Sequence, residues 1–157
     1  MSVHFLKREQ IIFSPIEIVW DYFSAPENLN NLTPPDMNFE ILTNPLVRMF
    51  EGQLIEYRVQ IFPGIRTLWL TEISHIRQLE YFVDEQRLGP YAFWYHEHKF
   101  IKINDNQTKM IDNVTYSIGY GFVGSLLNYL FIGKKLSEIF DFRSLKITEL
   151  FPGQERQ

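Results

Sequence analysis

Residues 121–151 read GFVGSLLNYLFIGKKLSEIFDFRSLKITELF. The apolar residues of this stretch recur three and four positions apart, which is the spacing of one face of an α-helix. They are Leu126, Leu130, Leu136, Ile139, Phe140, Ile147 and Leu150. Most of the charged residues lie off this stripe. The spacing predicts an amphipathic helix of about 25 to 30 residues, which is long for a domain of this size.

Upstream of this helix, seven segments show the apolar alternation and the bounding turn residues of strands. Turns are indicated at Pro63-Gly64, at Gly89-Pro90 and at Asn104-Asp105-Asn106. The expected strands are residues 2–13, 38–43, 52–61, 66–76, 79–86, 91–103 and 108–118.

Two short helices are expected between the first strand and the others. Ser14, Pro15 and Glu17 form a capping box with proline in the first turn, and they predict a helix that continues to Phe23. Residues 25–32 predict a second short helix. The element order therefore predicts an α+β fold: a curved seven-stranded antiparallel sheet around the long C-terminal helix, with room for an apolar cavity between them.

Length and composition narrow the possible functions. The 157 residues fit one domain, which we place at residues 1–151 with a tail at 152–157. The net charge is −4 and no basic run exceeds two residues, so nucleic acid is not an expected partner. The absence of cysteine excludes disulfides, thiolate catalysis and cysteine-ligated zinc.

The sequence also bears on location. The N-terminus lacks the apolar core of a signal peptide, so a cytoplasmic protein is expected. Residues 113–133 carry no charge, but their polar side chains and glycines argue against an integral membrane segment. Aromatic residues make up 16% of the chain, and such large rings either fill a core or line an apolar pocket.

Several segments together resemble a known superfamily. They are Pro15–Phe23, the stretch from Asn28-Leu29 to Pro34-Pro35, Trp94–Phe100, Met110–Tyr116 and Ile139–Arg143. In this order and spacing the chain resembles the SRPBCC superfamily, also called START-like, helix-grip or Bet v 1-like. Within it, the chain looks most like the small bacterial ligand-binding SRPBCC proteins. The superfamily contains carriers, receptors and polyketide cyclases, so the resemblance implies a fold rather than one function.

The resemblance carries two further implications. The turns at Phe62-Pro63-Gly64 and Leu88-Gly89-Pro90 look like the loops at the cavity mouth in this superfamily. Relatives often have a proline soon after the last strand, whereas this chain has Ser117-Ile118-Gly119-Tyr120-Gly121. We therefore expect a looser connection into the long helix.

The two strands that flank residues 104–106 carry the most polar chemistry. On each of them every second side chain shares one sheet face. A hairpin tip with an odd number of residues would put the two faces on the same side, with His98 beside Asp112. The same register would pair Trp94 with Tyr116. An even tip would move Asp112 to the opposite face.

The histidines allow three interpretations. His98 and Asp112 can form a general base with its orienting group, a buried pair that satisfies its own hydrogen bonds, or an anchor for a ligand carbonyl or hydroxyl. His96 and His98 also have a spacing that a metal ion can use, with Asp112 as the necessary third ligand. We assign no catalytic residue, no metal and no cofactor from the sequence.

Two residues of the long helix break its pattern. Arg143 lies on the apolar stripe, where a guanidinium needs an acceptor: a carboxylate of the sheet, or an acidic or carbonyl-bearing ligand. Its head could instead extend to water. Gly133 lies in the helix interior and costs about 1 kcal/mol relative to alanine, which close packing or space for a ligand would offset.

The residues expected to form a ligand site combine these polar groups with aromatic and apolar wall residues. They are Trp94, His96, His98, Asp112, Tyr116, Phe62, Trp69, Tyr57, Leu130, Gly133, Phe140 and Arg143.

The favoured hypothesis is a protein that binds or transports a small lipophilic molecule in an apolar cavity. No phosphate-binding loop or nucleophile motif is present, so a self-contained enzyme is less favoured. One alternative is a polyketide cyclase or aromatase-like enzyme that uses the same cavity. The other is a protein-interaction module with a cavity filled by side chains. The sequence does not identify a protein partner.

Overall fold

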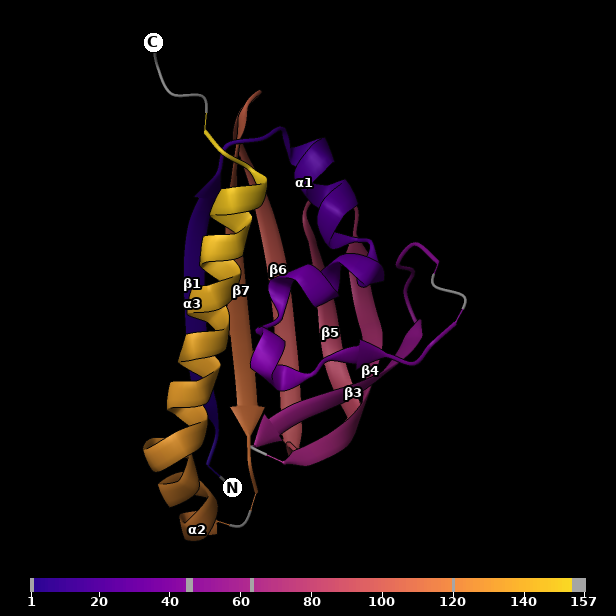
Figure 1. Cartoon of the computed structure of the whole chain (residues 1–157). Coiled ribbons are helices and arrows are strands. Elements are labelled where there is room, and N and C mark those ends of the chain that lie inside the picture. Colours follow the sequence, from indigo (N-terminus) through magenta and orange to yellow (C-terminus); the bar gives the residue numbers. More distant parts are fainter. Residues whose placement is uncertain (1, 45–46, 63, 120, 154–157) are drawn as a thin grey trace.

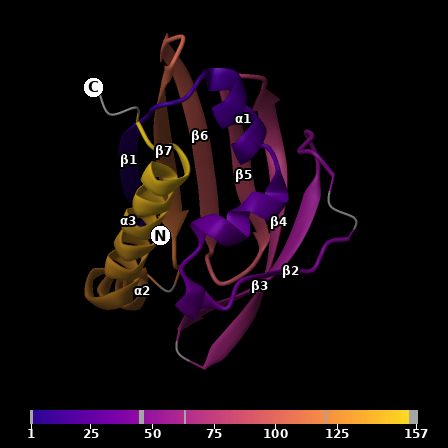
Figure 2. The ribbon, with the colours of Figure 1, turned by 45° about the horizontal axis from the view of Figure 1, so that its top comes forward.

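The computed structural model describes residues 2–44, 47–62, 64–119 and 121–153, without the side chains of residues 62, 123, 125, 127 and 128. One seven-stranded antiparallel sheet curves around the long C-terminal helix, and the short helices of residues 16–37 lie across the same concave face (Figures 1 and 2). The strand order is β1-β7-β6-β5-β4-β3-β2. The predicted fold class is confirmed.

The elements follow the predicted order. They are β1 (His4–Ile12), α1 (Ile16–Phe23), η1 (Pro26–Leu32), η2 (Pro35–Met37), β2 (Glu40–Ile41), β3 (Leu54–Phe62), β4 (Ile65–Arg77), β5 (Tyr81–Leu88), β6 (Phe93–Asn104), β7 (Gln107–Ser117), α2 (Gly121–Leu127), η3 (Asn128–Ile132) and α3 (Gly133–Leu150). Among the described residues, no helix is both long enough and apolar enough to cross a membrane.

The pairing of β6 with β7 sets the face of every polar residue in the candidate site. His98 lies opposite Asp112, as an odd hairpin tip would place it. The tip itself holds only residues 105–106, but the register shifts by one between Lys102 and Asn104. This β-bulge adds the residue that an even tip lacks. Of the two registers that the sequence left open, the structure has the one that pairs His98 with Asp112, through a bulge that the sequence did not indicate.

The C-terminal helix is interrupted by one π-helical turn, η3. On α3 the inward-facing residues are Leu136, Phe140, Arg143 and Ile147. The predicted stripe is wrong for Leu126 and Leu130, which are 47% and 49% exposed, and for Leu150 at the helix end. A π-turn holds an extra residue, so it rotates the helix face before it relative to the face after it.

The start of α1 also differs from the prediction. The N-cap is Pro15 rather than Ser14, and no side chain caps the helix. The Pro15 carbonyl accepts hydrogen bonds from the backbone N–H groups of Ile18 and Val19. Ser14 is fixed instead through its carbonyl oxygen, which accepts a hydrogen bond of 2.9 Å from the buried Thr108 hydroxyl. The bond ties β7 to the turn between β1 and α1.

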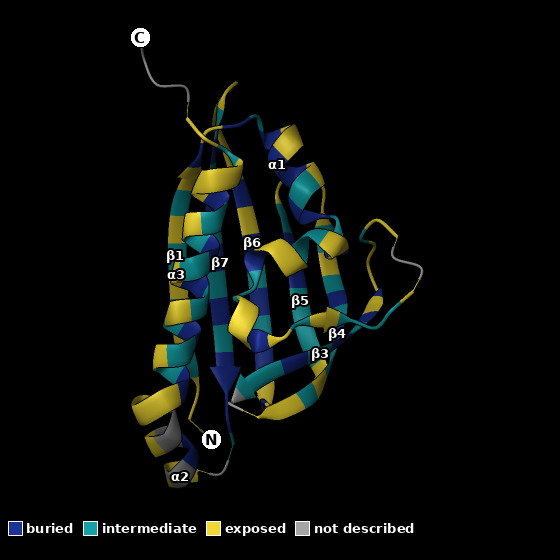
Figure 3. Ribbon diagram, viewed as in Figure 1, coloured by how far each residue is buried: buried dark blue, intermediate teal, exposed yellow. Residues whose placement is uncertain are grey.

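The core lies between the concave sheet face and the helices (Figure 3). One cluster packs beneath α1 around Trp20, Phe23 and Phe100. A second cluster packs beneath the N-terminal half of α3 around Trp94 and Leu136. The two clusters lie on either side of the polar residues of β6, and the inner face between them is not completely filled.

Candidate ligand cavity and its charged wall

A cavity lies between the concave face of the sheet, the segment from α1 to η2, and α3. The space open to the centre of a water molecule is about 190 Å³. Its wall is mostly apolar and aromatic, which is the usual lining of a small-molecule site. Ile55, Trp69, Phe82 and Trp94 come from the strands, and Leu32 and Leu136 come from the helices.

The rim of the cavity includes a cross-element ion pair. Lys135 on α3 lines the cavity, and its Nζ lies 2.7 Å from Oδ2 of Asp36 on η2. The pair links the long helix to the segment that covers the sheet. Because the Asp36 carboxylate is 65% exposed, the pair contributes little stability, but it shows where α3 and η2 come together.

Most of the residues predicted for the site line this cavity. They are Tyr57, Trp69, Trp94, His96, His98, Phe140 and Arg143. Asp112 and Tyr116 are buried but lie outside the lining, and Leu130 faces solvent. Gly133 in the first turn of α3 is also outside the lining. The side chain of Phe62 falls outside the described part of the chain.

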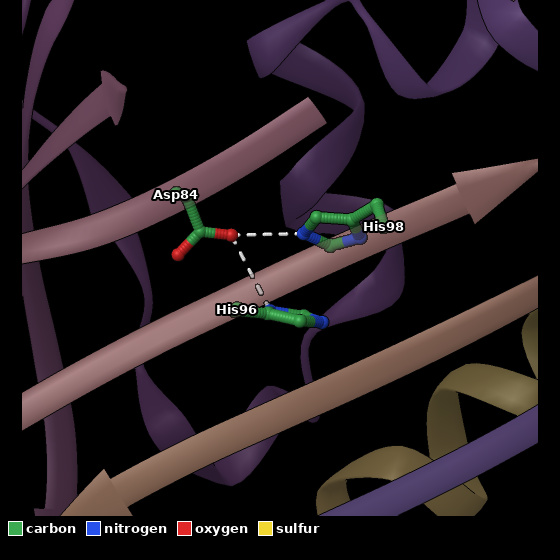
Figure 4. Close-up of side chains that lie close together, drawn as sticks. All are labelled: Asp84, His96 and His98. Carbon is green, nitrogen blue, oxygen red and sulfur yellow. Dashed lines mark hydrogen bonds and ion pairs between the residues drawn. The ribbon is translucent and has the colours of Figure 1, made fainter. Parts of the chain in front are cut away.

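Four polar side chains from three adjacent strands form a cluster at the cavity wall. His98 Nε2 lies 2.8 Å from Asp84 Oδ2, and His96 Nε2 lies 2.9 Å from Asp112 Oδ1. His96 Nδ1 lies 3.3 Å from the same Asp84 oxygen, so both imidazoles reach this carboxylate (Figure 4). The two rings lie with their centroids 3.7 Å apart and their planes tilted by 37°.

The fourth contact of the cluster differs from the others. His98 Nδ1 lies 3.0 Å from Asp112 Oδ1, but the contact lacks hydrogen-bond geometry. This buried nitrogen has no hydrogen-bond partner among the described residues. A buried polar atom without a partner costs about 1 to 3 kcal/mol, so a hydrogen bond from a ligand to His98 Nδ1 would be favourable.

Within the cluster, the two carboxylates and His96 shift one another's pKa values toward the charged forms. Burial alone would raise the pKa of Asp84, but His96 and His98 hold it well below its usual value. Burial would likewise raise the pKa of Asp112, but the Arg143 charge and the two imidazoles hold it low. Burial would lower the pKa of His96, yet the two carboxylates raise it. Both carboxylates are therefore ionised at neutral pH.

Arg143 supplies a further positive charge from α3. Its guanidinium carbon lies 5.7 Å from the centroid of the Phe23 ring and 5.8 Å from that of Phe140. The residue is buried, so its head does not extend to water. Within the described chain, its Nε has no hydrogen-bond partner and the guanidinium forms no ion pair within 4.0 Å. Its charge acts on Asp112 through space.

Asp84 is the site residue that sequence reasoning missed. It lies on β5, lines the cavity, and its Oδ1 accepts a hydrogen bond of 3.1 Å from the Trp94 indole. A signal was present, because Phe82 and Asp84 are two residues apart and share a face. A carboxylate on the face of a core phenylalanine indicates a buried charge that requires partners.

No protein-family model and no curated protein sequence matches the chain. Solved structures do match over nearly its whole length. A START superfamily protein from Mycobacterium smegmatis has a TM-score of 0.69 at 12% identity, over 94% of this chain and 99% of that one. The chain has the START-like, helix-grip fold.

Two further proteins with the START-like fold have names that describe enzymes. The norcoclaurine synthase of Thalictrum flavum has a TM-score of 0.66 at 13% identity, over 95% of this chain and 96% of that one. The aromatase/cyclase of Streptomyces sp. R1128 has a TM-score of 0.65 at 13% identity, over 92% of this chain and 88% of that one. At these identities the likeness establishes the fold alone.

Proposed function

We propose that the protein binds a small lipophilic molecule in the cavity between the sheet and α3. The observation that carries this proposal is the character of the wall: it is apolar and aromatic over most of its area, and apart from Lys135 at the rim its charged groups gather around Asp84. Such a distribution suits an amphiphilic ligand, because the apolar body is desolvated while one polar end is oriented. The open space in the described residues disfavours an interaction module with a filled interior.

The charged wall indicates what the polar end contains. Arg143 lines the cavity between two phenylalanine rings, and its Nε is a buried donor without an acceptor. A ligand oxygen would satisfy this donor, so a carbonyl, carboxylate or hydroxyl oxygen is the expected group. We place this oxygen at the wall formed by Arg143 and His98, and the hydrocarbon part toward Ile55 and Trp69.

A cyclase or aromatase-like enzyme is the second candidate, favoured by one observation. His98 and Asp84 are 2.8 Å apart and both line the cavity, which is the arrangement of a general base and its orienting carboxylate. In this case His98→Ala would stop turnover while ligand affinity stayed near the wild-type value. A carrier would catalyse no reaction, so His98→Ala would have no turnover to abolish.

The first test is native mass spectrometry of the purified protein, before and after organic extraction. A bound lipophilic mass that disappears on extraction supports the proposal and identifies the ligand class. The second test uses a fluorescent naphthalene dye as an apolar probe, so it does not depend on the expression host.

Cavity-filling variants make the dye experiment specific. Val59 is buried on β3 and lines the cavity, so Val59→Phe should weaken dye binding about tenfold or more. Leu68→Phe adds a comparable ring on the exposed side of β4 and should leave affinity unchanged. If Val59→Phe fails to fold, Thr71→Leu fills the same cavity from β4. Wild-type affinity in a folded cavity-filling variant would overturn the proposal.

A further inference from the structure

We propose that Asp84, His96 and His98 form a binding site for a divalent first-row transition-metal ion, such as Zn²⁺, at the charged wall of the cavity. The three side chains come from β5 and β6, and all three line the cavity. The site stands on its own geometry and does not depend on the lipophilic ligand.

The donor atoms lie close enough together to share one ion, and the 2.8 Å hydrogen bond between Asp84 Oδ2 and His98 Nε2 would lengthen slightly on binding. Asp84 Oδ2 lies 3.3 Å from His96 Nδ1 and 2.8 Å from His98 Nε2, and all three atoms lie within 4.8 Å of one another. Zinc binds nitrogen and oxygen at about 2.0 to 2.2 Å, so adjacent ligands on one ion lie about 3 to 3.5 Å apart. Figure 4 shows both imidazoles directed at the Asp84 carboxylate from one side.

Groups behind the ligands would hold two of them in place. A histidine that binds a metal commonly presents its other nitrogen to a carboxylate. His96 Nε2 makes such a hydrogen bond to Asp112 Oδ1 at 2.9 Å, whereas His98 Nδ1 lies 3.0 Å from the same oxygen without hydrogen-bond geometry. The Trp94 indole donates to Asp84 Oδ1, so Oδ2 is the oxygen that faces the two imidazoles.

The protons of the cluster give an independent argument. Each imidazole has a carboxylate near both of its nitrogens, but a neutral imidazole carries only one N–H. Without a metal ion, each ring must either carry two protons or face a carboxylate with a lone pair. Two protonated rings would lie with their centroids only 3.7 Å apart. An ion bound to His96 Nδ1 and His98 Nε2 would take the place of one proton on each ring, and each remaining N–H would lie near Asp112.

The donor set indicates the class of ion and its coordination. Two imidazoles and one carboxylate suit zinc, iron, cobalt or nickel better than calcium or magnesium, which prefer oxygen ligands. Three protein ligands leave at least one coordination position open, as catalytic zinc sites do. Because all three residues line the cavity, the open position would face the ligand space.

The decisive experiment uses the wild-type chain, treated with a chelator, labelled with ¹⁵N-histidine and titrated with Zn²⁺. The protein has four histidines, which makes assignment practical. We expect saturation at one equivalent, with large shifts at His96 Nδ1 and His98 Nε2 and none at His4 or His75. The opposite choice of nitrogen on either ring, changes at His4 or His75 alone, or no saturable binding would overturn the proposal.

Variants test the ligand roles by isothermal titration with Zn²⁺. Asp84→Asn should weaken binding about 100-fold or more, because a charged ligand is lost. Asp112→Asn should weaken it about 10- to 100-fold, as expected of a group that orients the ligands. His75 is exposed on β4, so His75→Ala should bind Zn²⁺ like the wild type. Unchanged affinity in a folded Asp84→Asn protein, or lost affinity in His75→Ala, would contradict the assignment.

The outcome is separable from that of the proposed function. Dye binding by the chelator-treated protein reports on the apolar cavity alone, and the histidine spectra report on the metal alone. A chain that binds the dye but shows no histidine shifts retains the first proposal and rejects the second.

Discussion

His98 lies directly opposite Asp112 in the pairing of β6 with β7, yet its Nε2 hydrogen bonds to Asp84 on the other neighbouring strand. His96 does the reverse, with Nε2 bonded to Asp112 and Nδ1 close to Asp84. Each ring therefore bridges two carboxylates, and the four side chains link β5, β6 and β7 on the concave face. The stability of the sheet at this point depends on a balance of buried charges.

Asp84→Asn should destabilise the metal-free protein by about 3 kcal/mol or more, because it leaves two buried imidazoles with half of their counter-charge. Urea unfolding at neutral pH in the presence of a chelator measures this loss. Asp105→Asn is the matched control, because its side chain is 92% exposed and pairs with Lys102 at the hairpin tip. The control should unfold like the wild type. Equal unfolding midpoints for the two variants would show that the cluster carries no net stability.

Part of the site could be predicted from the sequence because it depends on alternation. The period of two along β6 puts His96 and His98 on one face, whereas the face of Asp112 depends on the bulge between Lys102 and Asn104. The long helix could be predicted from Leu136 onward, where its α-helical geometry is regular. These features arise from periodicity, which a single sequence displays directly.

Other features were missed because of local irregularities. Asp84 shares a face with Phe82, but the alternation of β5 is weak and its pairing with β4 shifts register between Ile73 and His75. The π-turn at residues 128–132 turned Leu130 toward solvent, although its spacing fits an ideal helix. A bulge or a π-turn adds one residue and so shifts the apolar pattern by one position. The types of the neighbouring residues do not show where this extra residue lies.

Arg143→Met should destabilise the protein by about 2 kcal/mol, although methionine preserves much of the packing against Phe23 and Phe140. The variant removes the cation that does most to hold the pKa of the buried Asp112 low. Thermal or urea unfolding tests this directly. Arg77→Met, at an exposed arginine of β4, should change stability little. Wild-type stability in Arg143→Met would mean that the histidines alone balance Asp112.

Tyrosine ionisation provides a pH-dependent prediction. Burial raises the pKa of Tyr57 above its ordinary value of 10.0, with a further contribution from the Asp84 charge, and burial also raises that of Tyr91. A group whose folded pKa is raised stabilises the fold less as pH rises past the ordinary value. Between about pH 10 and 12 these phenols should therefore stay neutral in the folded protein and ionise together with unfolding.

Ultraviolet absorbance of tyrosinate and circular dichroism, recorded on the same samples, test this coupling. Tyr57→Phe should remove the absorbance of one tyrosinate from the step that accompanies unfolding. It should leave unchanged the earlier phase, in which tyrosines ionise while the protein is still folded. A loss from the earlier phase would show that Tyr57 is accessible to hydroxide in the folded state, and hence that the cavity is open to water at this wall.

Tryptophan fluorescence should report on occupancy of the cavity. Trp69 and Trp94 both line it and contact each other edge to face, with ring centroids 5.1 Å apart. Trp20, the third tryptophan, packs under α1 against Phe82 and Phe100 and is not part of the lining. An apolar dye in the cavity should therefore quench the emission of the first two more strongly than that of Trp20.

The matched comparison is Trp20→Phe against the double variant Trp69→Phe with Trp94→Phe. Trp20→Phe should keep most of the dye-dependent quenching, and the double variant should lose most of it. Trp94→Phe also removes the hydrogen bond to Asp84 Oδ1, so dye affinity must be measured beside the quenching. Quenching that follows Trp20 instead would place the dye against Trp20, which is not part of the cavity lining. That result would reject the cavity as the binding site even if the affinity were high.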